Sequence, residues 1–426
     1  MDGYKKRIAD ELLAKKLKSK GAVLIEGAKW CGKTTTAEEC ARSVLYMNDP
    51  SRMQQNLTLA DMDPEALLEG DSPRLIDEWQ LAPKLWDAIR FSVDHKRRFG
   101  LYILTGSAVP ANLDEIHHTG TGRFSWLRMR PMSLFESGES TGDISIASLF
   151  ISPEENIRGS ANLSLHDIAH LICRGGWPMA LDVPVDVALQ QAFDYFDAVV
   201  KEDVSRVDGV KKDSEFLKRL MRSYARAQGG QVSASTIVAD LNSNEESEYC
   251  NRTASNYIKA LKKIFVIEDM EAWNPNLRSK TAIRTSDTRY FTDPSIASAS
   301  LGIGRPGDLM NDLETMGLLF ETLAVRDLRV YSDLLDASVY HYRDKSGLEC
   351  DAVIHCRNGS YGLVEIKLGG DKLINEGAAS LKKLSSVIDT EKMKAPSFMM
   401  IITAVGDRAY KRPDGVLVVP IGALRP

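Results

Sequence analysis

The sequence predicts an α/β protein whose first region is a parallel, doubly wound sheet. Short apolar runs, such as Ala22–Ile25 and Leu101–Ser107, are separated by helical stretches, a pattern typical of βαβ units. A glycine-containing loop, residues 27–34, joins the first run to a stretch that we expect to be helical, Thr35–Ser43. A strand, a glycine loop and a helix in this order form the ligand-binding edge of such a sheet.

The composition of the 426 residues is that of a protein with several domains. Hydrophobic residues make up 43% and charged residues 27%, which are ordinary globular values. The net charge of −5 gives no overall attraction to DNA or to anionic membranes, so a nucleic-acid surface has to be a local patch. No run approaches the roughly eighteen apolar residues of a membrane span. Six cysteines without a C-x-x-C pair indicate reduced thiols, and we expect a cytoplasmic protein with no membrane partner.

The octet Gly27–Thr34 fits G-x-x-x-x-G-K-[ST], the phosphate-binding loop of nucleoside triphosphatases. Its glycines let backbone N–H groups turn toward the β-phosphate, Lys33 supplies charge to the β- and γ-phosphates, and the Thr34 hydroxyl can bind Mg²⁺. We therefore expect ATP and Mg²⁺ as cofactors. The predicted nucleotide-binding residues are Gly27, Ala28, Lys29, Trp30, Cys31, Gly32, Lys33, Thr34 and Thr35.

A second motif, Arg74–Glu78, has the form of a Walker B strand that ends in two carboxylates. Asp77 would hold Mg²⁺ together with Thr34, and Glu78 would orient and deprotonate the attacking water. The pair of carboxylates predicts hydrolysis as well as binding, with Lys33 and Glu78 as catalytic residues.

Two more strands are expected in the sheet, at Val44–Asn48 and Leu101–Ser107. The second of these places Thr105 and Ser107 at the carboxyl end of a strand, beside the phosphate-binding loop. A hydroxyl there can position the lytic water or contact the γ-phosphate, so both residues are catalytic candidates.

Further along, Gly120–Phe124 precedes a stretch rich in arginine and apolar residues, Trp126–Leu134. This order of parts resembles AAA-type ATPases, in particular a bacterial and archaeal group that joins an N-terminal AAA module to a long C-terminal domain of unknown function. In that family the arginine just before the last strand reaches the γ-phosphate of a neighbouring subunit. The resemblance thus implies this role for Arg123 and a homo-oligomeric ring.

Four domains are expected. A polar, turn-rich stretch at Ser152–Ser164 marks the exit from the ATPase domain into a helical lid. Two short helices at Ser233–Leu241 and Thr253–Leu261, followed by an apolar run and a Pro/Asn turn, resemble a winged helix-turn-helix. The predicted boundaries are 1–150 for the ATPase domain, 151–215 for the lid, 216–295 for the winged helix and 296–426 for a nuclease-like α/β domain.

The winged-helix region is locally basic. Between Arg252 and Arg289 there are eight Lys or Arg against four Asp or Glu. These cations could bind DNA phosphates, although a winged helix can equally pack against protein and the fold alone does not decide between these uses. The predicted DNA-binding residues are Arg252, Lys259, Lys262, Lys263, Arg278, Lys280, Arg284 and, at the end of the stretch, Arg289.

The C-terminal region contains a second charged motif, on two predicted hairpin strands. Residues two apart on a strand share a face, so Glu365 and Lys367 point together and the hairpin can bring Asp351 alongside. With Glu321 on the preceding helix, the order resembles the PD-(D/E)xK nuclease fold, in which carboxylates hold Mg²⁺ and the lysine steadies the nucleophilic water. This region is therefore either an active nuclease or a nuclease-like scaffold.

These features predict an ATP-hydrolysing AAA-type ATPase that acts on DNA by remodelling it or by processing branched forms. Two alternatives remain. One is a nucleotide-dependent switch that binds a protein partner and uses the nuclease-like region as a scaffold. The other is an ATP-regulated, metal-dependent nuclease.

Overall fold

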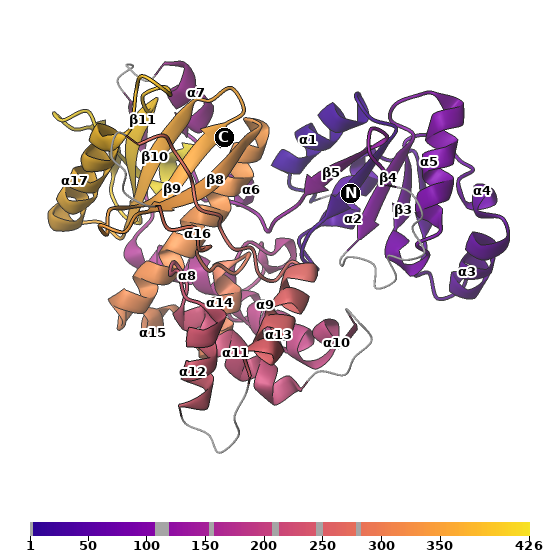
Figure 1. Cartoon of the computed structure of the whole chain (residues 1–426). Helices are drawn as coiled ribbons and strands as arrows, with labels where there is room; N and C mark the ends of the chain where they lie inside the picture. The colour runs from indigo at the N-terminus through magenta and orange to yellow at the C-terminus, as the bar shows by residue number, and fades with distance from the viewer. Residues whose placement is uncertain (1–2, 107–118, 153–156, 207–212, 244–249, 278–282) are drawn as a thin grey trace. The chain divides into compact units, whose positions relative to one another are not determined.

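The computed structural model describes residues 3–106, 119–152, 157–206, 213–243, 250–277 and 283–426 (Figure 1). The chain divides into two compact units, each of which is considered by itself. The first unit comprises Met1–Pro131, Lys201–Lys212 and Lys259–Val266, and the second comprises Met132–Val200, Asp213–Ile258 and Ile267–Pro426. Among the described residues, no helix is long and apolar enough to cross a membrane.

The first unit contains five strands in the order β2-β3-β4-β1-β5, and every pair is parallel. The strands are β1 (Ala22–Glu26), β2 (Ser43–Tyr46), β3 (Arg74–Asp77), β4 (Tyr102–Gly106) and β5 (Phe124–Arg128). The helices before and between them are α1 (Ile8–Leu17), α2 (Lys33–Cys40), α3 (Met53–Met62), α4 (Pro64–Leu67) and α5 (Leu85–Lys96). This sheet confirms the predicted α/β class.

Helices flank the sheet, which explains the apolar strands. Ile76 of β3 and Leu104 of β4 share one core with Trp86 of α5. Successive side chains of a strand point to opposite faces, so Asp77 and Thr105 are turned away from that core. Helix α2 contacts both strands, and its first turn meets Asp77 and completes the site described below.

The second unit begins with a helical part. The helices of this unit include α6 (Leu134–Ser137), α7 (Ile146–Ile151), α8 (Leu165–Arg174), α9 (Val185–Ala198), α11 (Ser214–Arg226), α12 (Ala234–Asn242), α14 (Pro294–Leu301), α15 (Pro306–Met310), α16 (Leu313–Leu334) and α17 (Asp371–Val387). Helix α14 contacts α8, α9, α11 and α16 and is buried along almost its whole length. Its alanine and serine side chains are small, so the surrounding helices can approach closely.

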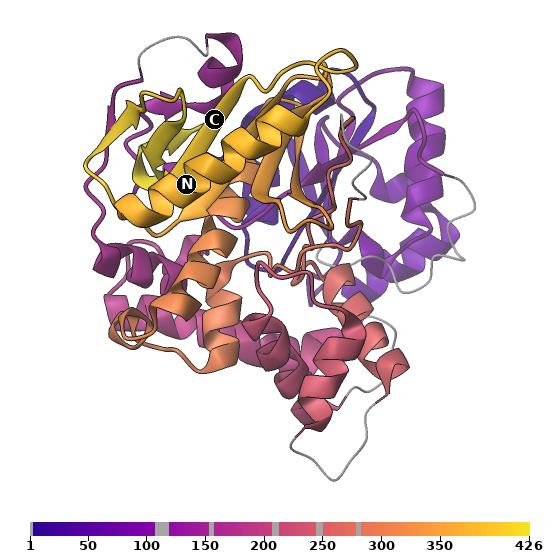
Figure 2. The ribbon, with the colours of Figure 1, turned by 60° about the vertical axis from the view of Figure 1, so that its left-hand side comes forward.

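A mixed sheet of seven strands completes the second unit, in the order β7-β12-β13-β11-β10-β9-β8. The strands are β7 (Gly159–Ser160), β8 (Ala337–Arg343), β9 (Glu349–Cys356), β10 (Tyr361–Lys367), β11 (Phe398–Thr403), β12 (Arg408–Lys411) and β13 (Leu417–Pro420). The predicted hairpin is present, because β9 and β10 pair antiparallel across a tight turn at Asn358-Gly359. Helix α17 lies across β9, β10 and β11 (Figure 2), while α16 contacts β8, β9 and β10.

The two compact units do not follow the four boundaries expected from the sequence. Residues 132–150, which we assigned to the ATPase domain, belong to the second unit, where β6 (Ile144–Ser145) pairs with β14 (Leu424–Arg425). In the same way β7, expected in the lid, pairs with β12. Strands of two residues carry no readable alternation, so these long-range pairings have no local sequence signal. Conversely, Lys201–Lys212 and Lys259–Val266, expected in the lid and the winged helix, belong to the first unit.

The region in which we expected the winged helix contains α11, α12 and α13 (Asn251–Lys263). Ser233 caps α12 through a hydrogen bond from the Thr236 amide, as a hydroxyl at this position predicts. Isolated antiparallel bridges join Ile267 to Phe291 and Met270 to Thr288 after the helices. The winged-helix assignment itself stays a prediction.

Candidate functional site

The phosphate-binding loop begins where β1 ends and finishes where α2 starts, at Lys33, earlier than the expected Thr35. Trp30 and Gly32 have left-handed backbones, with φ of 65° and 98°. Turns of this kind direct successive N–H groups into a shared concavity that binds anions. At Gly27 an added Cβ would lie 2.0 Å from the carbonyl oxygen of Met129, so this position requires glycine.

Lys33 lies inside this loop. It is buried, and its Nζ donates hydrogen bonds to the carbonyl oxygens of Gly27 (3.0 Å) and Ala28 (2.7 Å). Both acceptors are neutral, so the contacts orient the ammonium group without neutralising its charge. A phosphate oxygen is a stronger acceptor because it is charged. The geometry of Lys33 therefore fits the predicted role in phosphate binding.

Asp77 joins the two predicted motifs. Its Oδ1 accepts a hydrogen bond from Thr34 Oγ1 at 2.7 Å and another from Thr105 Oγ1 at 2.5 Å. Asp77 and Thr105 are register partners on β3 and β4, so the sheet itself sets the second contact. A hydroxyl and a carboxylate oxygen are the ligand types that Mg²⁺ prefers, and the pair predicted to hold that ion is thus assembled.

Glu78 follows β3 on a left-handed backbone, with φ of 55°. This turn takes it out of the strand that we expected it to end, and its carboxylate accepts a hydrogen bond from the Gln80 amide. Burial raises the pKa of the Glu78 carboxyl above its ordinary value, and the neighbouring charge of Asp77 adds to this rise. A carboxylate with a raised pKa is a better proton acceptor, which is what a general base needs.

Arg123 lies in the turn before β5, and its exposed guanidinium is paired with Asp94, with 2.7 Å between Nε and Oδ1. Ala22 at the start of β1 is in register with Phe124, so Arg123 lies at the amino end of the sheet. The phosphate-binding loop follows the carboxyl end, about 16 Å away along a five-residue strand. Arg123 is therefore too far from the loop of its own chain to contact a phosphate bound there. Ser107 lies outside the described residues.

Two contacts in the first unit have no counterpart in the sequence motifs. Lys29 of the loop forms an ion pair with Asp203, which is 174 positions away in the chain. Arg128, at the end of β5, lies 4.3 Å from the ring centroid of Phe265. Sequence reasoning missed Asp203, and its distance along the chain left no local signal by which to find it.

In the second unit the charged residues expected from the sequence come together at a fork in the sheet. Strands β9 and β10 pair from their turn as far as Ala352 with Val364. Farther from the turn, β9 continues to pair with β8, and β10 continues to pair with β11. The Asp351 carboxylate occupies the fork and accepts a hydrogen bond from the Ile366 amide at 2.7 Å. Lys367 Nζ lies 2.9 Å from Asp351 Oδ2 and 2.6 Å from Glu365 Oε2.

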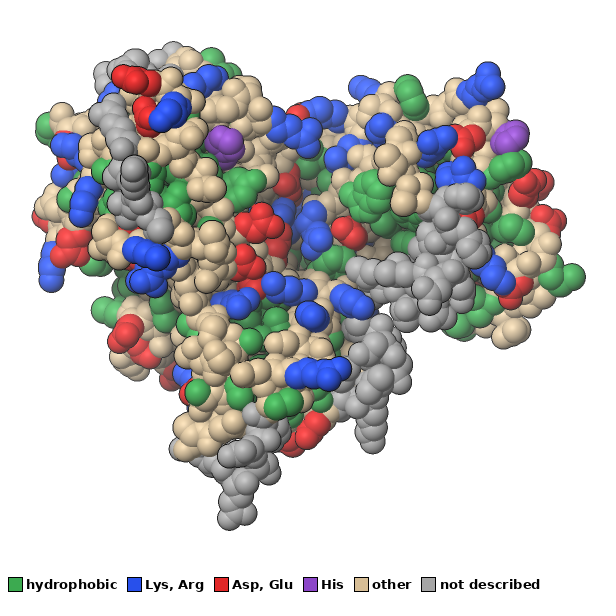
Figure 3. Space-filling view, in the orientation of Figure 1, with side chains coloured by type: hydrophobic (Ala, Val, Ile, Leu, Met, Phe, Trp, Pro, Cys, Tyr) green, Lys and Arg blue, Asp and Glu red, His purple; other side chains and the backbone are tan. Residues whose placement is uncertain are grey.

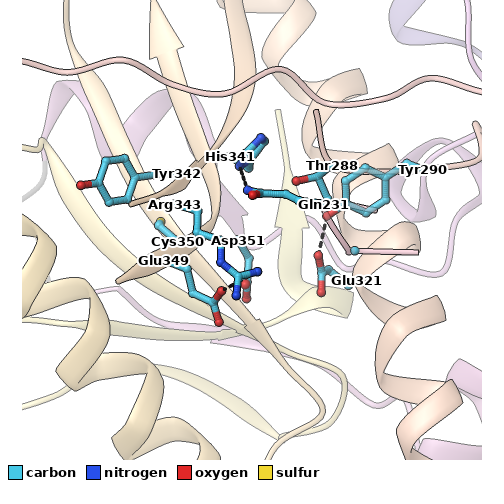
Figure 4. A pocket seen from close by; sticks show the side chains of 11 residues that line it. Gln231, Thr288, Tyr290, Glu321, His341, Tyr342, Arg343, Glu349, Cys350 and Asp351 are labelled. Atoms are coloured by element: carbon cyan, nitrogen blue, oxygen red, sulfur yellow. Dashed lines mark hydrogen bonds and ion pairs between the residues drawn. The ribbon is translucent and has the colours of Figure 1, made fainter. Parts of the chain in front are cut away.

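Glu321, the fourth residue of this predicted site, accepts a hydrogen bond from the Tyr290 hydroxyl. It lines a small pocket with Asp351, Glu349 and Tyr290 (Figure 4). The cavity volume is about 30 Å³, which is room for a few water molecules. Gly229 covers Glu321 so closely that an added Cβ would lie 2.9 Å from both carboxylate oxygens. The pocket therefore leaves room for water beside the Glu321 carboxylate.

Burial dominates the electrostatics of this cluster. It raises the pKa of Glu321 to about 8, with a further contribution from the charge of Asp351. It raises the pKa of Glu365 well above the ordinary value for the same two reasons. For Lys367, burial alone would lower the pKa, but the carboxylates of Asp351 and Glu365 outweigh it and raise the pKa. Within the described part of the chain, no group of three or more His, Cys, Asp or Glu is arranged to hold a metal ion.

The predicted DNA-binding residues differ in exposure. Arg252, Lys259 and Lys263 are exposed on α13, and Lys262 is partly exposed. Figure 3 shows the Lys and Arg side chains of one face of the molecule in blue. Arg284 is also exposed, whereas Arg278 and Lys280 lie outside the described residues.

Arg289 does not belong with this set. Its guanidinium forms an ion pair with the buried Asp269 and donates to the carbonyl oxygen of Val232 at 2.9 Å. The structure thus engages its charge inside the fold, and the expected phosphate contact stays a prediction.

Comparison with family models divides the chain into three parts. Residues 19–137 match the AAA domain, residues 165–307 match a domain of unknown function, DUF8612, and residues 316–424 match another, DUF4143. The first match contains both nucleotide motifs and the whole parallel sheet. This part of the chain is a P-loop AAA domain, as its resemblance to AAA-type ATPases implied.

Solved structures give weaker similarity. A Walker-type ATPase of Pyrococcus abyssi is 13% identical, with a TM-score of 0.41 over 68% of this chain and 94% of the other. The ORC2 protein of Aeropyrum pernix, solved in ADPNP–ADP complexes, is 14% identical, with a TM-score of 0.31 over 71% of this chain and 92% of the other. A signal transduction ATPase with a tetratricopeptide repeat sensor from Pyrococcus horikoshii is 14% identical, with a TM-score of 0.24 over 78% of this chain and 49% of the other. No curated protein matches the chain significantly.

Proposed function

We propose that the protein is an AAA-type ATPase that binds ATP with Mg²⁺ and hydrolyses it. The hydrogen bond from Thr34 to Asp77 carries this proposal, because it joins the phosphate-binding loop to the second motif. Lys33 would contact the β- and γ-phosphates, Thr34 and Asp77 would hold the metal ion, and Glu78 would deprotonate the attacking water. The bound Mg²⁺ supplies neutralisation of the charge that develops on the phosphates.

Two variants of the full chain test this proposal. Lys33→Ala removes the charge that faces the phosphates and should abolish ATP binding, measured by calorimetry. Glu78→Gln should bind ATP but lose phosphate release by about 10²- to 10⁴-fold, the range for loss of a general base. Glu39→Gln, the same change at an exposed position on α2, is the control. Wild-type rates in both test variants would refute the ATPase assignment.

We further propose that the ATPase acts on DNA, by remodelling it or by processing branched forms. The support is the basic surface of α13: Arg252, Lys259 and Lys263 are seven and four positions apart, a spacing that puts them on one helix face. A stripe of cations on an exposed helix can bind consecutive backbone phosphates. The acidic whole chain restricts such binding to this local surface.

Salt dependence provides the test. Replacing Arg252, Lys259 and Lys263 by Ala should reduce the slope of log affinity against log salt by about one unit per lost phosphate contact. Duplex, single-stranded and branched DNA are measured in parallel, together with their effect on ATP hydrolysis. Lys18→Ala, at an exposed cation outside α13, is the control. If DNA neither binds nor changes hydrolysis while a protein partner stimulates it, the protein is a nucleotide-dependent protein switch instead.

We propose that the ATPase works as a homo-oligomeric ring, because Arg123 is exposed and lies at the opposite end of the sheet from its own loop. The charge of Arg123 can serve catalysis only on the nucleotide of another subunit. The six cysteines are all free, which supports a cytoplasmic location.

A metal-dependent nuclease is the second candidate function. One observation favours it. Glu365 Oε1 is buried without a hydrogen-bond partner, as expected for an oxygen that can coordinate a metal ion. Glu365→Gln should then eliminate Mg²⁺- or Mn²⁺-dependent cleavage while ATP hydrolysis continues. Absence of cleavage of any DNA or RNA form by the wild-type protein would identify the domain as a scaffold.

A further inference from the structure

A segment from far along the chain approaches the phosphate-binding loop within the first unit. Asp203 belongs to this segment, and its carboxylate pairs with the ammonium of Lys29. The Asp203 side chain is 8% exposed, whereas the Lys29 side chain is 40% exposed. A largely buried carboxylate is thus held at the loop by a cation that still reaches solvent.

The backbone around Asp203 is unusual. Between α9 and α10 (Val204–Arg206) the helix passes through a π-helical turn, Val199–Asp203, and Asp203 is the last residue of this turn. π-Helical turns are rare and occur frequently at functional sites, because they widen the helix and redirect its side chains. The ion pair therefore lies at the point where the helix departs from regular geometry.

Lys29 is a residue of the phosphate-binding loop itself. It follows Gly27 in the loop and precedes Trp30, whose backbone is left-handed. The positive charges of Lys33 and Lys29 both lower the pKa of Glu78, so both ammonium groups lie within electrostatic reach of the proposed general base. A γ-phosphate bound between Lys33 and Glu78 would meet Lys29 as a second cation.

We infer that Lys29 is a second phosphate-binding lysine and that Asp203 is a positioning residue that competes for it with the γ-phosphate. This inference rests on the proposed nucleotide site. ATP would draw Lys29 away from Asp203, whereas ADP lacks the γ-phosphate and would leave the pair intact. Asp203 thus reduces the preference of the loop for ATP over ADP.

The test compares dissociation constants for a non-hydrolysable ATP analogue and for ADP, measured by calorimetry on the full chain. Asp203→Asn should tighten binding of the ATP analogue by about fivefold, the size of a partly exposed ion pair, and change ADP binding by less than about twofold. Lys29→Met should weaken binding of the analogue and leave ADP binding unchanged. Asp203→Glu, which keeps the carboxylate, should restore the wild-type ratio.

A double-variant cycle separates this role from general electrostatics and from folding. In the Lys29→Met background, Asp203→Asn should have no further effect, because Asp203 acts through Lys29. Glu202→Gln removes the same charge from an exposed neighbour and is the control. The inference is overturned if Asp203→Asn tightens the binding of the ATP analogue and ADP equally. It is also overturned if Asp203→Asn tightens binding of the analogue to the same extent in the Lys29→Met background. If Asp203→Asn does not fold, the Lys29→Met variant decides. An equal loss of affinity for the ATP analogue and for ADP in this variant overturns the inference.

The outcome also distinguishes this inference from the proposed function. Wild-type protein that binds no nucleotide would refute both. A different result would refute only the role of Asp203. In that result the wild-type protein binds ATP and the Lys33→Ala variant does not, but Asp203→Asn leaves the ratio of the ATP-analogue and ADP affinities unchanged.

Discussion

Each unit contains a lysine in its predicted site, but the two lysines are engaged in opposite ways. Lys33 of the first unit donates to neutral backbone carbonyls. Lys367 of the second unit bridges the carboxylates of Asp351 and Glu365. The charge of Lys33 thus remains for a ligand, whereas the charge of Lys367 is neutralised inside the fold. The same residue types therefore indicate a ligand site in one unit and leave a self-contained cluster in the other.

The surroundings strengthen the difference. Close to Lys33 in the chain, Trp30 and Gly32 have left-handed backbones, which are typical of anion-binding loops. In the second unit Gly229 and Tyr290 pack against Glu321, which lines a cavity of about 30 Å³. A charged motif alone does not identify an active site; the partners of its charges and the space beside them decide.

The largest effects should come from the same substitution at the two lysines. Lys33→Met should lower ATP affinity by about 10²- to 10⁴-fold, through loss of two charge-assisted hydrogen bonds, without lowering the unfolding temperature. Lys367→Met should leave ATP affinity intact and lower the free energy of unfolding by about 3–5 kcal/mol, because two carboxylates lose their cation. Calorimetry and denaturant unfolding measure these quantities. A more stable Lys367→Met variant would instead indicate a strained catalytic site, as in a nuclease.

Arg123 tests whether the first site is completed by another subunit. Arg123→Ala should retain ATP binding, while hydrolysis falls by a factor on the order of 10³. Mixing it with Glu78→Gln protein should restore part of the activity, since each variant supplies what the other lacks. A protein that is monomeric with ATP present and still hydrolyses it at the normal rate would contradict the ring.

The second cluster predicts a pH dependence of stability. Glu321 has a pKa of about 8 in the folded protein against 4.5 as its ordinary value. Between these values the folded state binds a proton that the unfolded chain has lost, so stability is highest at the acidic end and falls as pH rises toward 8. Thermal unfolding at pH 5, 6.5 and 8 should show a falling midpoint that Glu321→Gln makes less steep. An identical slope in this variant would show that Glu321 titrates normally.

The smallest effect is expected at Thr105, which contributes one of two hydrogen bonds to Asp77. Thr105→Val keeps the side-chain shape and removes this bond, which is worth about 1 kcal/mol. Hydrolysis should therefore fall about fivefold to tenfold with ATP affinity unchanged. Thr105→Ser keeps the hydroxyl and should behave as wild type. Equal rates in all three proteins would mean that Thr34 alone orients Asp77.

The sequence predicted the strand, the glycine loop and the helix of the phosphate-binding motif because these parts are local. A glycine loop between a strand and a helix is specified by neighbouring residues, and the end of β3 carries Asp77. It also predicted that Asp351 would meet Glu365 and Lys367, since a tight turn sets the register of β9 and β10. The fork of the sheet at Asp351 could not be foreseen, because it depends on pairing with β8 and β11.

By itself the sequence determined the α/β class, the phosphate-binding loop and the residues that could carry chemistry, because periodicity and short motifs express local backbone preferences. Only the tertiary structure decided which charges have partners. It joined Asp203 to Lys29, directed Arg289 inward to Asp269, and paired the short strand β6 with β14. Such contacts depend on how distant segments pack and on which polar groups are buried away from water. Local sequence patterns specify neither of these.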